Sequence, residues 1–246
     1  MRNVVSACSV SRSSRWVECA DRKLTLCIPD MQTENIQISS VLSRAFLLYG
    51  GFMDKLQQRA IAFRHLIDYE YKIILGRKGK QTGLSINFEA SDFFHLIGLH
   101  KLTDIINGKL PSEKIFYDCL KRNITYEQLT KSLFFNLLGN RFEYFHCLEK
   151  ILDNNNMIFK CNTSTLKNFS RITADFELKN IYEALIFYLF IEKRSYSEYQ
   201  CCKSFINNNI VDYTYGQTKM TLLYKEKINV KTGQSRVQYD KLTPLK

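Results

Sequence analysis

The chain has 246 residues, of which 45% are hydrophobic, 13% aromatic and 24% charged, with only three prolines. This composition excludes collagen-like and intrinsically disordered chains, and it can supply one large core, or one domain with an appendage. No apolar run reaches the roughly 18 residues needed to span a bilayer. We therefore expect a soluble, cytoplasmic protein with no membrane partner.

The net charge of +11 is unevenly distributed. Residues 81–216 are electrically neutral, whereas residues 55–80 and 217–246 each carry seven basic against two acidic side chains. If the two basic segments lie side by side, they form a surface suited to phosphates, because cations release counterions from a polyanion. A solubilising surface with no partner is the alternative, and charge alone does not choose between them.

Eight cysteines are present, and none forms a C-x-x-C pair. A chain of this length does not need disulfide staples, so we expect free thiols in a reducing cytosol. Residues 1–16 have no continuous apolar segment, which argues against a signal peptide.

The first part of the chain differs from the rest. Residues 1–35 are rich in Ser, Arg and Cys with weak periodicity, and residues 36–49 have the apolar spacing of a short helix. We expect an N-terminal extension over residues 1–52, partly disordered with a short helix near 36–49, followed by one domain over residues 53–246.

The next elements are helical and hairpin-like. Asp54 is placed to cap a helix over residues 55–68. Alternation over 71–75 and 84–88, joined by the basic turn at 76–80, predicts a β-hairpin with a cationic tip. Ser91 is expected to cap a helical segment that reaches Leu102 and contains Gly98.

The middle of the chain is predicted to be helical and the last third to be strands. Thr125 and Gln128 form a capping box. The expected helices cover residues 112–121, 126–137 and 141–152. The expected strands cover residues 157–161, 169–178, 184–192, 199–205, 218–228 and 234–239. Helices followed by strands favour an α+β fold, with N-terminal and middle helices packed on an antiparallel β-sheet formed mainly by the C-terminal half.

Motif searches exclude several chemistries. The chain has no P-loop, dinucleotide-binding or hydrolase-elbow motif. A helical metal site needs histidines four residues apart, but His95 and His100 are five apart, with no Cys or carboxylate at a ligand spacing. We expect no metal and no cofactor.

His95, His100 and Lys101 lie within seven residues of an apolar segment interrupted by Gly98. Imidazole is the side chain best suited to proton transfer near neutral pH, and a bend at Gly98 would let both rings face one site. The alternative is that His95 is a core histidine bonded to a backbone carbonyl and His100 is a surface residue.

Two further segments offer binding groups. Residues 212–217 bring Tyr213, Thr214 and Gln217 beside a basic strand, as phosphate or base-reading donors or simply as a turn stabilised by Asp212. Arg141 opens a helix, where a cation opposes the helix dipole. This placement indicates an anionic partner, although a salt bridge to Glu143 or Glu127 serves equally.

Taken together, these segments resemble a phage- and mobile-element-associated branch of the barnase–EndoU–colicin–RelE-like nucleases. The resemblance runs from about residue 53 to the C-terminus. Its most specific part is residues 94–102, Phe-His-Leu-Ile-Gly-Leu-His-Lys-Leu. The segments 55–63, 71–80, 212–217 and 221–227 carry the remainder. The extension lies outside the resemblance, and Met53 stands where such proteins could begin.

The resemblance implies N-terminal helices on an antiparallel sheet, and metal-independent cleavage of RNA by attack of the 2′-hydroxyl on the neighbouring phosphorus. Carried onto this chain, His95 and His100 are the expected proton-transfer pair. Lys101 and Arg141 would stabilise the phosphorane, and Tyr213, Thr214 and Gln217 would donate to phosphate or base. The cations expected to guide the strand are Arg77, Lys78, Lys80, Lys219 and Lys225.

We therefore predict a toxin-like endoribonuclease of phage or mobile-element origin whose partner is RNA, with a possible host or phage protein partner. The main alternative is a non-catalytic RNA-binding module on the same surface. A structural or interaction protein with incidental charge is the third possibility. The nuclease hypothesis requires that the two basic segments converge around His95 and His100.

Overall fold

The computed structural model describes Arg15–Val17, Leu26–Ile28 and residues 53–243, except residues 107, 155, 156, 168 and 169. The chain divides into two units, Met1–Met53 and Asp54–Lys246. In the first unit, β1 (Arg15–Val17) pairs antiparallel with β2 (Leu26–Ile28). The helix expected near residues 36–49 lies outside the described residues.

The second unit begins with α2 (Lys55–Leu66), where Asp54 accepts hydrogen bonds from the backbone N–H groups of Leu56 and Gln57, as predicted. The chain then forms a hairpin of β3 (Tyr69–Arg77) and β4 (Lys80–Ile86). Lys78 and Gly79 make its turn with positive φ. The predicted cationic tip is confirmed.

Short helical segments follow. They are α3 (Asp92–Leu96), a 3₁₀ helix (Leu99–Lys101), α4 (Ser112–Leu120), α5 (Tyr126–Thr130), a 3₁₀ helix (Phe135–Leu137), α6 (Gly139–Tyr144), a 3₁₀ helix (Phe145–Cys147) and α7 (Leu148–Asp153). The capping box that begins α5 is confirmed. The long helices predicted over 126–137 and 141–152 are wrong. The first ends at Thr130, before a separate 3₁₀ helix at Phe135–Leu137, and the second is interrupted by the 3₁₀ helix Phe145–Cys147. After α5, Asp104 accepts hydrogen bonds from Ser132 Oγ and Leu133 N and redirects the chain.

The remaining elements are β5 (Met157–Lys160), α8 (Thr163–Leu166), β6 (Phe176–Tyr182), β7 (Leu185–Lys193), β8 (Gln200–Asn207), β9 (Thr218–Asn229) and β10 (Ser235–Asp240). Each predicted C-terminal strand has a counterpart. The strand predicted over 169–178 is displaced, since β6 begins only at Phe176.

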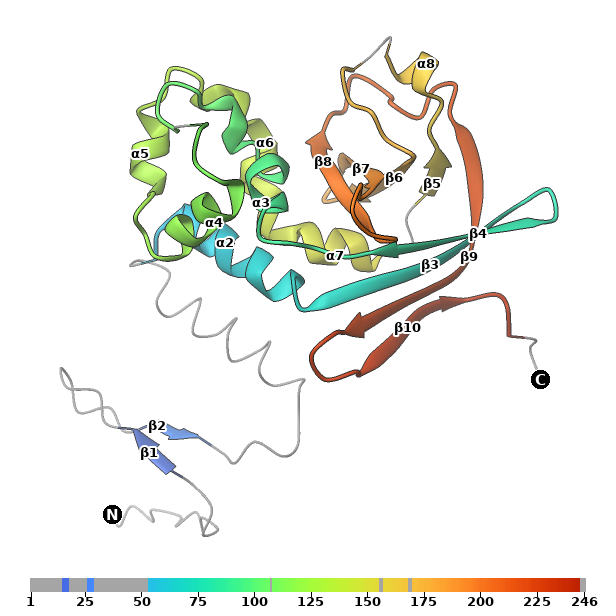
Figure 1. Ribbon diagram of the computed structural model, residues 1–246, viewed down its shortest axis with the longest axis horizontal. Helices are drawn as coiled ribbons and strands as arrows, with labels where there is room; N and C mark the ends of the chain where they lie inside the picture. Colours follow the sequence, from blue (N-terminus) through green and yellow to red (C-terminus); the bar gives the residue numbers. More distant parts are fainter. Residues whose placement is uncertain are drawn as a thin grey trace, which may run out of the picture. The chain divides into compact units, whose positions relative to one another are not determined.

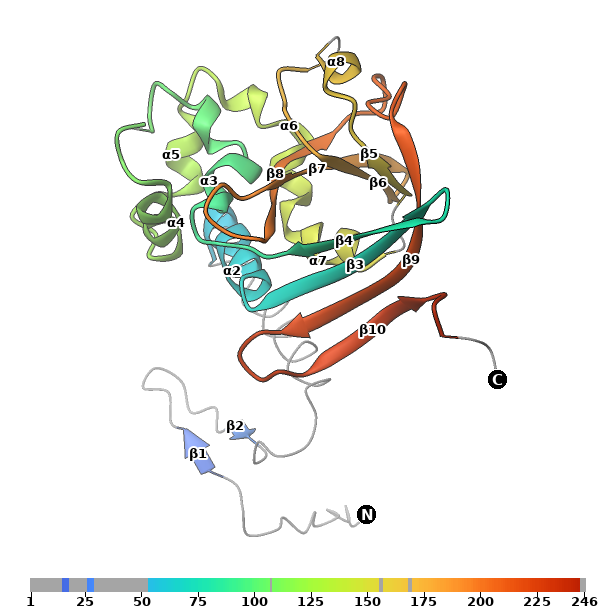
Figure 2. The same ribbon diagram turned by 45° about the vertical axis from the view of Figure 1, so that its right-hand side comes forward.

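The α+β class is confirmed, but the expected antiparallel sheet is wrong, because the strands form a closed, mixed barrel. The strand order is β10-β9-β3-β4-β8-β7-β6-β5, and β5 also pairs with β9. Within the described residues this closes a seven-strand barrel, with β10 attached outside it (Figures 1 and 2). The barrel is mixed, because β4 and β8 pair in parallel through Ile86 and Gln200.

One core joins the helices to the barrel. The ring of Phe63 in α2 lies 5.6–6.0 Å, centroid to centroid, from those of Phe88, Phe93, Phe116 and Phe145. Each such aromatic pair contributes about 0.5–1.5 kcal/mol beyond area burial. This cluster fixes α3 and α4 against α2.

A second, smaller core covers the other face of β7. Side chains alternate along a strand, so Phe187, Leu189 and Ile191 enter the main core, whereas Tyr188 and Phe190 pack with Tyr213. Burial on both faces explains the continuous apolar run of β7. No helix in the described part of the chain is long and apolar enough to cross a membrane.

Candidate active site

His95 and His100 lie next to each other. His95 is in α3 and His100 is in the 3₁₀ helix that follows, and Gly98, with a φ of +95°, turns the chain between them. Their ring centroids are 5.0 Å apart, with 39° between the ring planes. Both side chains are exposed. The alternative of a core histidine at position 95 is therefore wrong.

Arg141 comes from α6 and lies against this turn. A Cβ at Gly98 would be 3.3 Å from Arg141 Cδ, a tight contact that would require the arginine stem to shift, and the positive φ also favours glycine here. Arg141 is only 8% exposed, yet it makes no hydrogen bond or ion pair with any residue that the structure describes. The two carboxylates proposed as salt-bridge partners are used elsewhere, Glu143 by Arg59 and Glu127 by Lys131.

The pKa of each of the four basic groups in this cluster is lowered, by burial in every case and by the charges of cluster neighbours for His100 and Lys101. Loss of hydration, followed by the charges of His95, Arg141 and Lys101, lowers the pKa of His100 to about 4. Burial lowers the pKa of Arg141 to about 10, and burial and Arg141 lower that of Lys101. The pKa of His95 is lowered by loss of hydration and by Lys203. At pH 7 the cluster therefore holds two neutral imidazoles beside two cations.

Lys101 and Asn140 connect the cluster to its surroundings. Lys101 Nζ donates to the carbonyl of Leu137, which precedes α6, at 3.2 Å. Asn140 Nδ2 donates to Asn207 Oδ1 at the end of β8, at 3.0 Å. These contacts hold the start of α6 close to the His100 segment and to the barrel.

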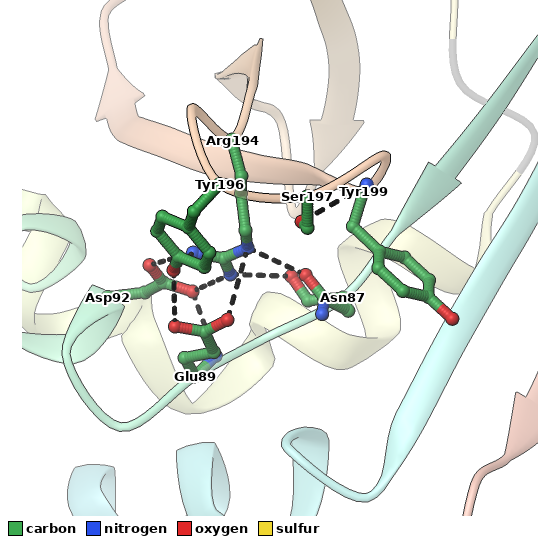
Figure 3. Close-up of polar contacts among 7 residues, drawn as sticks. All are labelled: Asn87, Glu89, Asp92, Arg194, Tyr196, Ser197 and Tyr199. Carbon is green, nitrogen blue, oxygen red and sulfur yellow. Dashed lines mark hydrogen bonds and ion pairs between the residues drawn. The ribbon is translucent and has the colours of Figure 1, made fainter.

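Asp92, the first residue of α3, is held by Arg194, which the sequence analysis did not identify (Figure 3). Arg194 lies after β7 and is 6% exposed. Its Nη2 atom is 2.5 Å from Asp92 Oδ2, and its Nε atom donates to Asn87 Oδ1 at 2.8 Å. Tyr196 adds a hydrogen bond to Glu89 at 2.6 Å. This network fixes the helix that presents His95.

The expected cap at Ser91 is wrong, because the Ser91 side chain makes no capping hydrogen bond. Asp92 Oδ2 instead accepts from the N–H of Glu89 at 2.8 Å. A single sequence does not distinguish a capping serine from an adjacent aspartate whose charge is paired with a residue about 100 positions later.

Of the second group of predicted residues, Tyr213 lies in the smaller core. Tyr213 is 8% exposed, packs on Tyr188 and Phe190, and interacts electrostatically with Arg141. Thr214 donates through its Oγ1 and N–H groups to Asp212, so the turn proposed as the alternative is present.

Gln217 holds the same loop from its other end. Its Oε1 atom accepts from the N–H of Asn162, and its buried Nε2 atom has no hydrogen-bond partner among the described residues. Thr214 and Gln217 thus shape the loop that carries Tyr213.

The guiding cations do not converge on the histidines. The basic segments do lie side by side, since β3 pairs with β9. However, the tip bearing Arg77, Lys78 and Lys80 and the start of β9 with Lys219 lie on the side of the domain opposite α3 in both views (Figures 1 and 2).

The prediction for Lys225 is wrong. This residue is 1% exposed, and its Nζ atom donates to the carbonyls of Leu152 and Asn154. It closes the end of α7 inside the barrel, because its alternation on β9 points it inward. In the described ranges, no three His, Cys, Asp or Glu side chains are grouped as metal ligands.

A family model assigns the chain to a class of nuclease. A family model described as phage-Barnase-EndoU-ColicinE5/D-RelE like nuclease 4 matches residues 55–242. The chain belongs to this family, which confirms the resemblance to the barnase–EndoU–colicin–RelE-like superfamily and implies a nuclease of that type. No curated protein and no solved structure matches the chain.

Proposed function

We propose that the protein is a metal-independent endoribonuclease acting at the His95–His100–Arg141 cluster. The observation that carries the proposal is Arg141, a residue that is only 8% exposed and has no hydrogen-bond or ion-pair partner among the described residues, beside two exposed imidazoles. A buried charge with no partner is costly, and a phosphate would supply the missing partner through two parallel hydrogen bonds.

The reaction needs a base and an acid. One imidazole removes the 2′-hydroxyl proton, and the oxygen attacks phosphorus in line. The bond from phosphorus to the 5′-oxygen breaks, and the second imidazole protonates that oxygen. The products are a 2′,3′-cyclic phosphate and a 5′-hydroxyl. Arg141 and Lys101 would stabilise the charge on the phosphorane oxygens.

Charge coupling supports the change of protonation that this reaction requires. The low pKa of His100 follows in part from neighbouring positive charge. A bound phosphate dianion or diester brings negative charge next to the ring and raises the pKa. Binding of the substrate would therefore favour uptake of a proton from solvent by the imidazole that serves as the acid.

The test is cleavage of labelled RNA in EDTA by the wild type, His95→Ala, His100→Ala and Arg141→Met. The matched control is His65→Ala, since His65 is an exposed histidine that pairs with Glu149 outside the cluster. We expect each cluster variant to lose about 10²–10⁴-fold in rate, with cyclic-phosphate ends from the wild type and no cleavage of a 2′-deoxy strand. Cleavage of the 2′-deoxy strand, or equal rates for His95→Ala and His65→Ala, would contradict the mechanism.

One observation favours a second function, an RNA-binding module without catalysis. In the free protein both imidazoles have lowered pKa values, so neither is protonated at pH 7. Salt-sensitive RNA binding that Arg141→Met abolishes, with no cleavage of any RNA by the wild type, would establish the module instead.

The nuclease proposal includes a biological role: a cytoplasmic, phage-derived toxin that acts with or without a protein partner.

A further inference from the structure

A groove lies on the sheet at the point along β9 where its pairing partner changes from β5 to β10. β9 pairs with β10 as far as Tyr224 and with β5 from Met220. Between them is a groove of about 270 Å³. Its lining consists of Met157, Lys219, Met220, Thr221, Leu222, Tyr239 and Lys241.

The cationic tip of the β3–β4 hairpin is next to the groove along the sheet. Thr221, which lines the groove, pairs with Gly76, the residue before Arg77. Lys80 pairs with Arg77 across the hairpin. These residues are neighbours along the sheet, and we call them together the distal basic surface. It consists of Arg77, Lys78, Lys80, Lys219, Tyr239 and Lys241.

The cations of this surface have no counter-ions. All five are exposed, and none forms an ion pair or a side-chain hydrogen bond within the described ranges. The neighbouring carboxylate of Asp240 instead accepts from Leu242 and Thr243. Elsewhere in this domain lysines on the same strand are neutralised, as Lys227 is by Glu149 and Asp153.

An aromatic ring lies among these cations. Tyr239 is half-buried in the wall of the groove, and Lys241 Nζ lies 5.7 Å from the centroid of its ring. Positive charge along a groove beside an aromatic face is the combination that binds single-stranded nucleic acid, with phosphates on the cations and a base on the ring.

We infer that the distal basic surface is a second nucleic-acid site that holds a single strand away from the His95–His100–Arg141 cluster. Its role as an exosite rests on the proposed nuclease function, whereas binding itself does not. Because the two sites lie on opposite sides of the domain, a long strand that occupies both gains from effective concentration and a dinucleotide does not.

The binding test uses the full chain with His95→Ala, so that RNA is not cleaved, and a fluorescent single-stranded RNA followed by anisotropy over a salt series. The test variant replaces four cations by glutamine, at Arg77, Lys78, Lys80 and Lys219. The matched control removes the same charge from exposed lysines on the helical side, at Lys114, Lys121, Lys131 and Lys150.

Each phosphate contact with a single strand contributes about 0.7 to the slope of log K against log salt. We therefore expect the test variant to reduce that slope by roughly 3 and to weaken binding by at least about tenfold, with a much smaller effect of the control. Equal weakening by the test and control variants would overturn the site, because binding would then follow net charge alone.

A second pair of variants probes the ring. We expect Tyr239→Leu to weaken binding by about tenfold and Tyr239→Phe to restore it, since stacking needs the ring and not the hydroxyl. If Tyr239→Leu has no effect and polyglutamate competes as well as RNA, the surface fits an acidic protein and the inference is wrong.

The exosite role is read separately from cleavage. In the catalytically intact chain, the four-glutamine variant is expected to lower kcat/KM for a strand longer than the usual site of about 4–16 nucleotides far more than for a dinucleotide. If the four-glutamine variant loses RNA binding but the wild type never cleaves RNA, the nuclease function is refuted and the distal binding site is retained. If the four-glutamine substitution lowers kcat/KM equally for the long strand and the dinucleotide, the exosite role is refuted and the nuclease function is retained.

Discussion

Replacing Arg141 by methionine is expected to stabilise the protein while it removes the anion-binding group. Arg141 is buried and has no partner within the described part of the chain. Its stem packs beside Gly98 and Leu138. Methionine keeps an unbranched stem of similar length, so the substitution removes the charge and leaves most of the packing.

The magnitude follows from the pKa. Burial lowers the pKa of Arg141 from 12.5 to about 10, and one pKa unit corresponds to 1.36 kcal/mol. The charged folded state thus bears a cost of at most about 3 kcal/mol. Because methionine recovers only part of this cost, we expect a gain of about 1–3 kcal/mol in the free energy of unfolding.

Urea unfolding at pH 7 measures this gain, and Arg59→Met is the matched control. Arg59 is equally buried, but it donates to the carbonyls of Phe142 and Glu143 and pairs with the Glu143 carboxylate. Its replacement leaves these groups without a donor and is expected to cost about 2–4 kcal/mol. Opposite signs for two buried arginines would establish that Arg141 is kept for binding.

A loss of stability in Arg141→Met would refute the reasoning, because it would mean that Arg141 has a structural partner. A second measurement is independent of folding. Since Arg141 lowers the pKa of His100, its removal is expected to raise that pKa, which NMR titration of the imidazole detects. An unchanged pKa of His100 would mean that the charge of Arg141 does not act on this imidazole.

Three further predictions follow. Burial raises the pKa of Glu177 from 4.5 to about 8, so its protonation favours the folded state at low pH. We expect the free energy of unfolding of the wild type to fall by about 2–4 kcal/mol as the pH rises from 4.5 to 8. This loss should be absent in Glu177→Gln. If urea unfolding shows the same difference in free energy between the wild type and Glu177→Gln at every pH, this prediction is contradicted. Gly98→Ala is expected to cost about 1–2 kcal/mol through its positive φ, and to lower cleavage by displacing the arginine stem; unchanged melting and cleavage would show that the turn tolerates a side chain. Arg194→Met should cost about 3–5 kcal/mol because Asp92 stays buried without its partner, and Asp92→Asn in the same protein should recover part of the loss. Failure of that recovery in thermal unfolding would exclude the ion pair as the cause.

Local patterns predicted the local structure. Asp54 before an apolar period of 3.6 predicted α2, and alternation around a Gly-rich basic turn predicted the β3–β4 hairpin. The capping box of Thr125 was readable for the same reason, because each of these signals lies within a few residues of the structure that it specifies.

Closure of the barrel was not predictable in this way. It depends on pairs such as Ile158 with Met220 and Ile86 with Gln200, which no local period encodes. The interrupted helices have the same origin, because Asp104 ends one of them from more than 20 residues away.

The candidate site was predictable in part. The spacing of His95, Gly98 and His100 indicated that both imidazoles could share a site, and the structure places their rings together. That Arg141 lacks a partner is a property of three-dimensional packing, since suitable carboxylates lie near it in sequence. For the same reason Lys225 looked like a surface cation, although its side chain is buried and donates to the carbonyls of Leu152 and Asn154.

The three strand pairs of β9 also bear on how the domain opens. β9 pairs with β3, β5 and β10, so its backbone amides cannot be freed without separating strands from the beginning, middle and end of the second unit. Local opening is therefore costly at this strand, and its central amides should exchange with solvent hydrogen only when the whole domain unfolds. The last long strand of the sequence is thus the element that makes unfolding of the barrel cooperative.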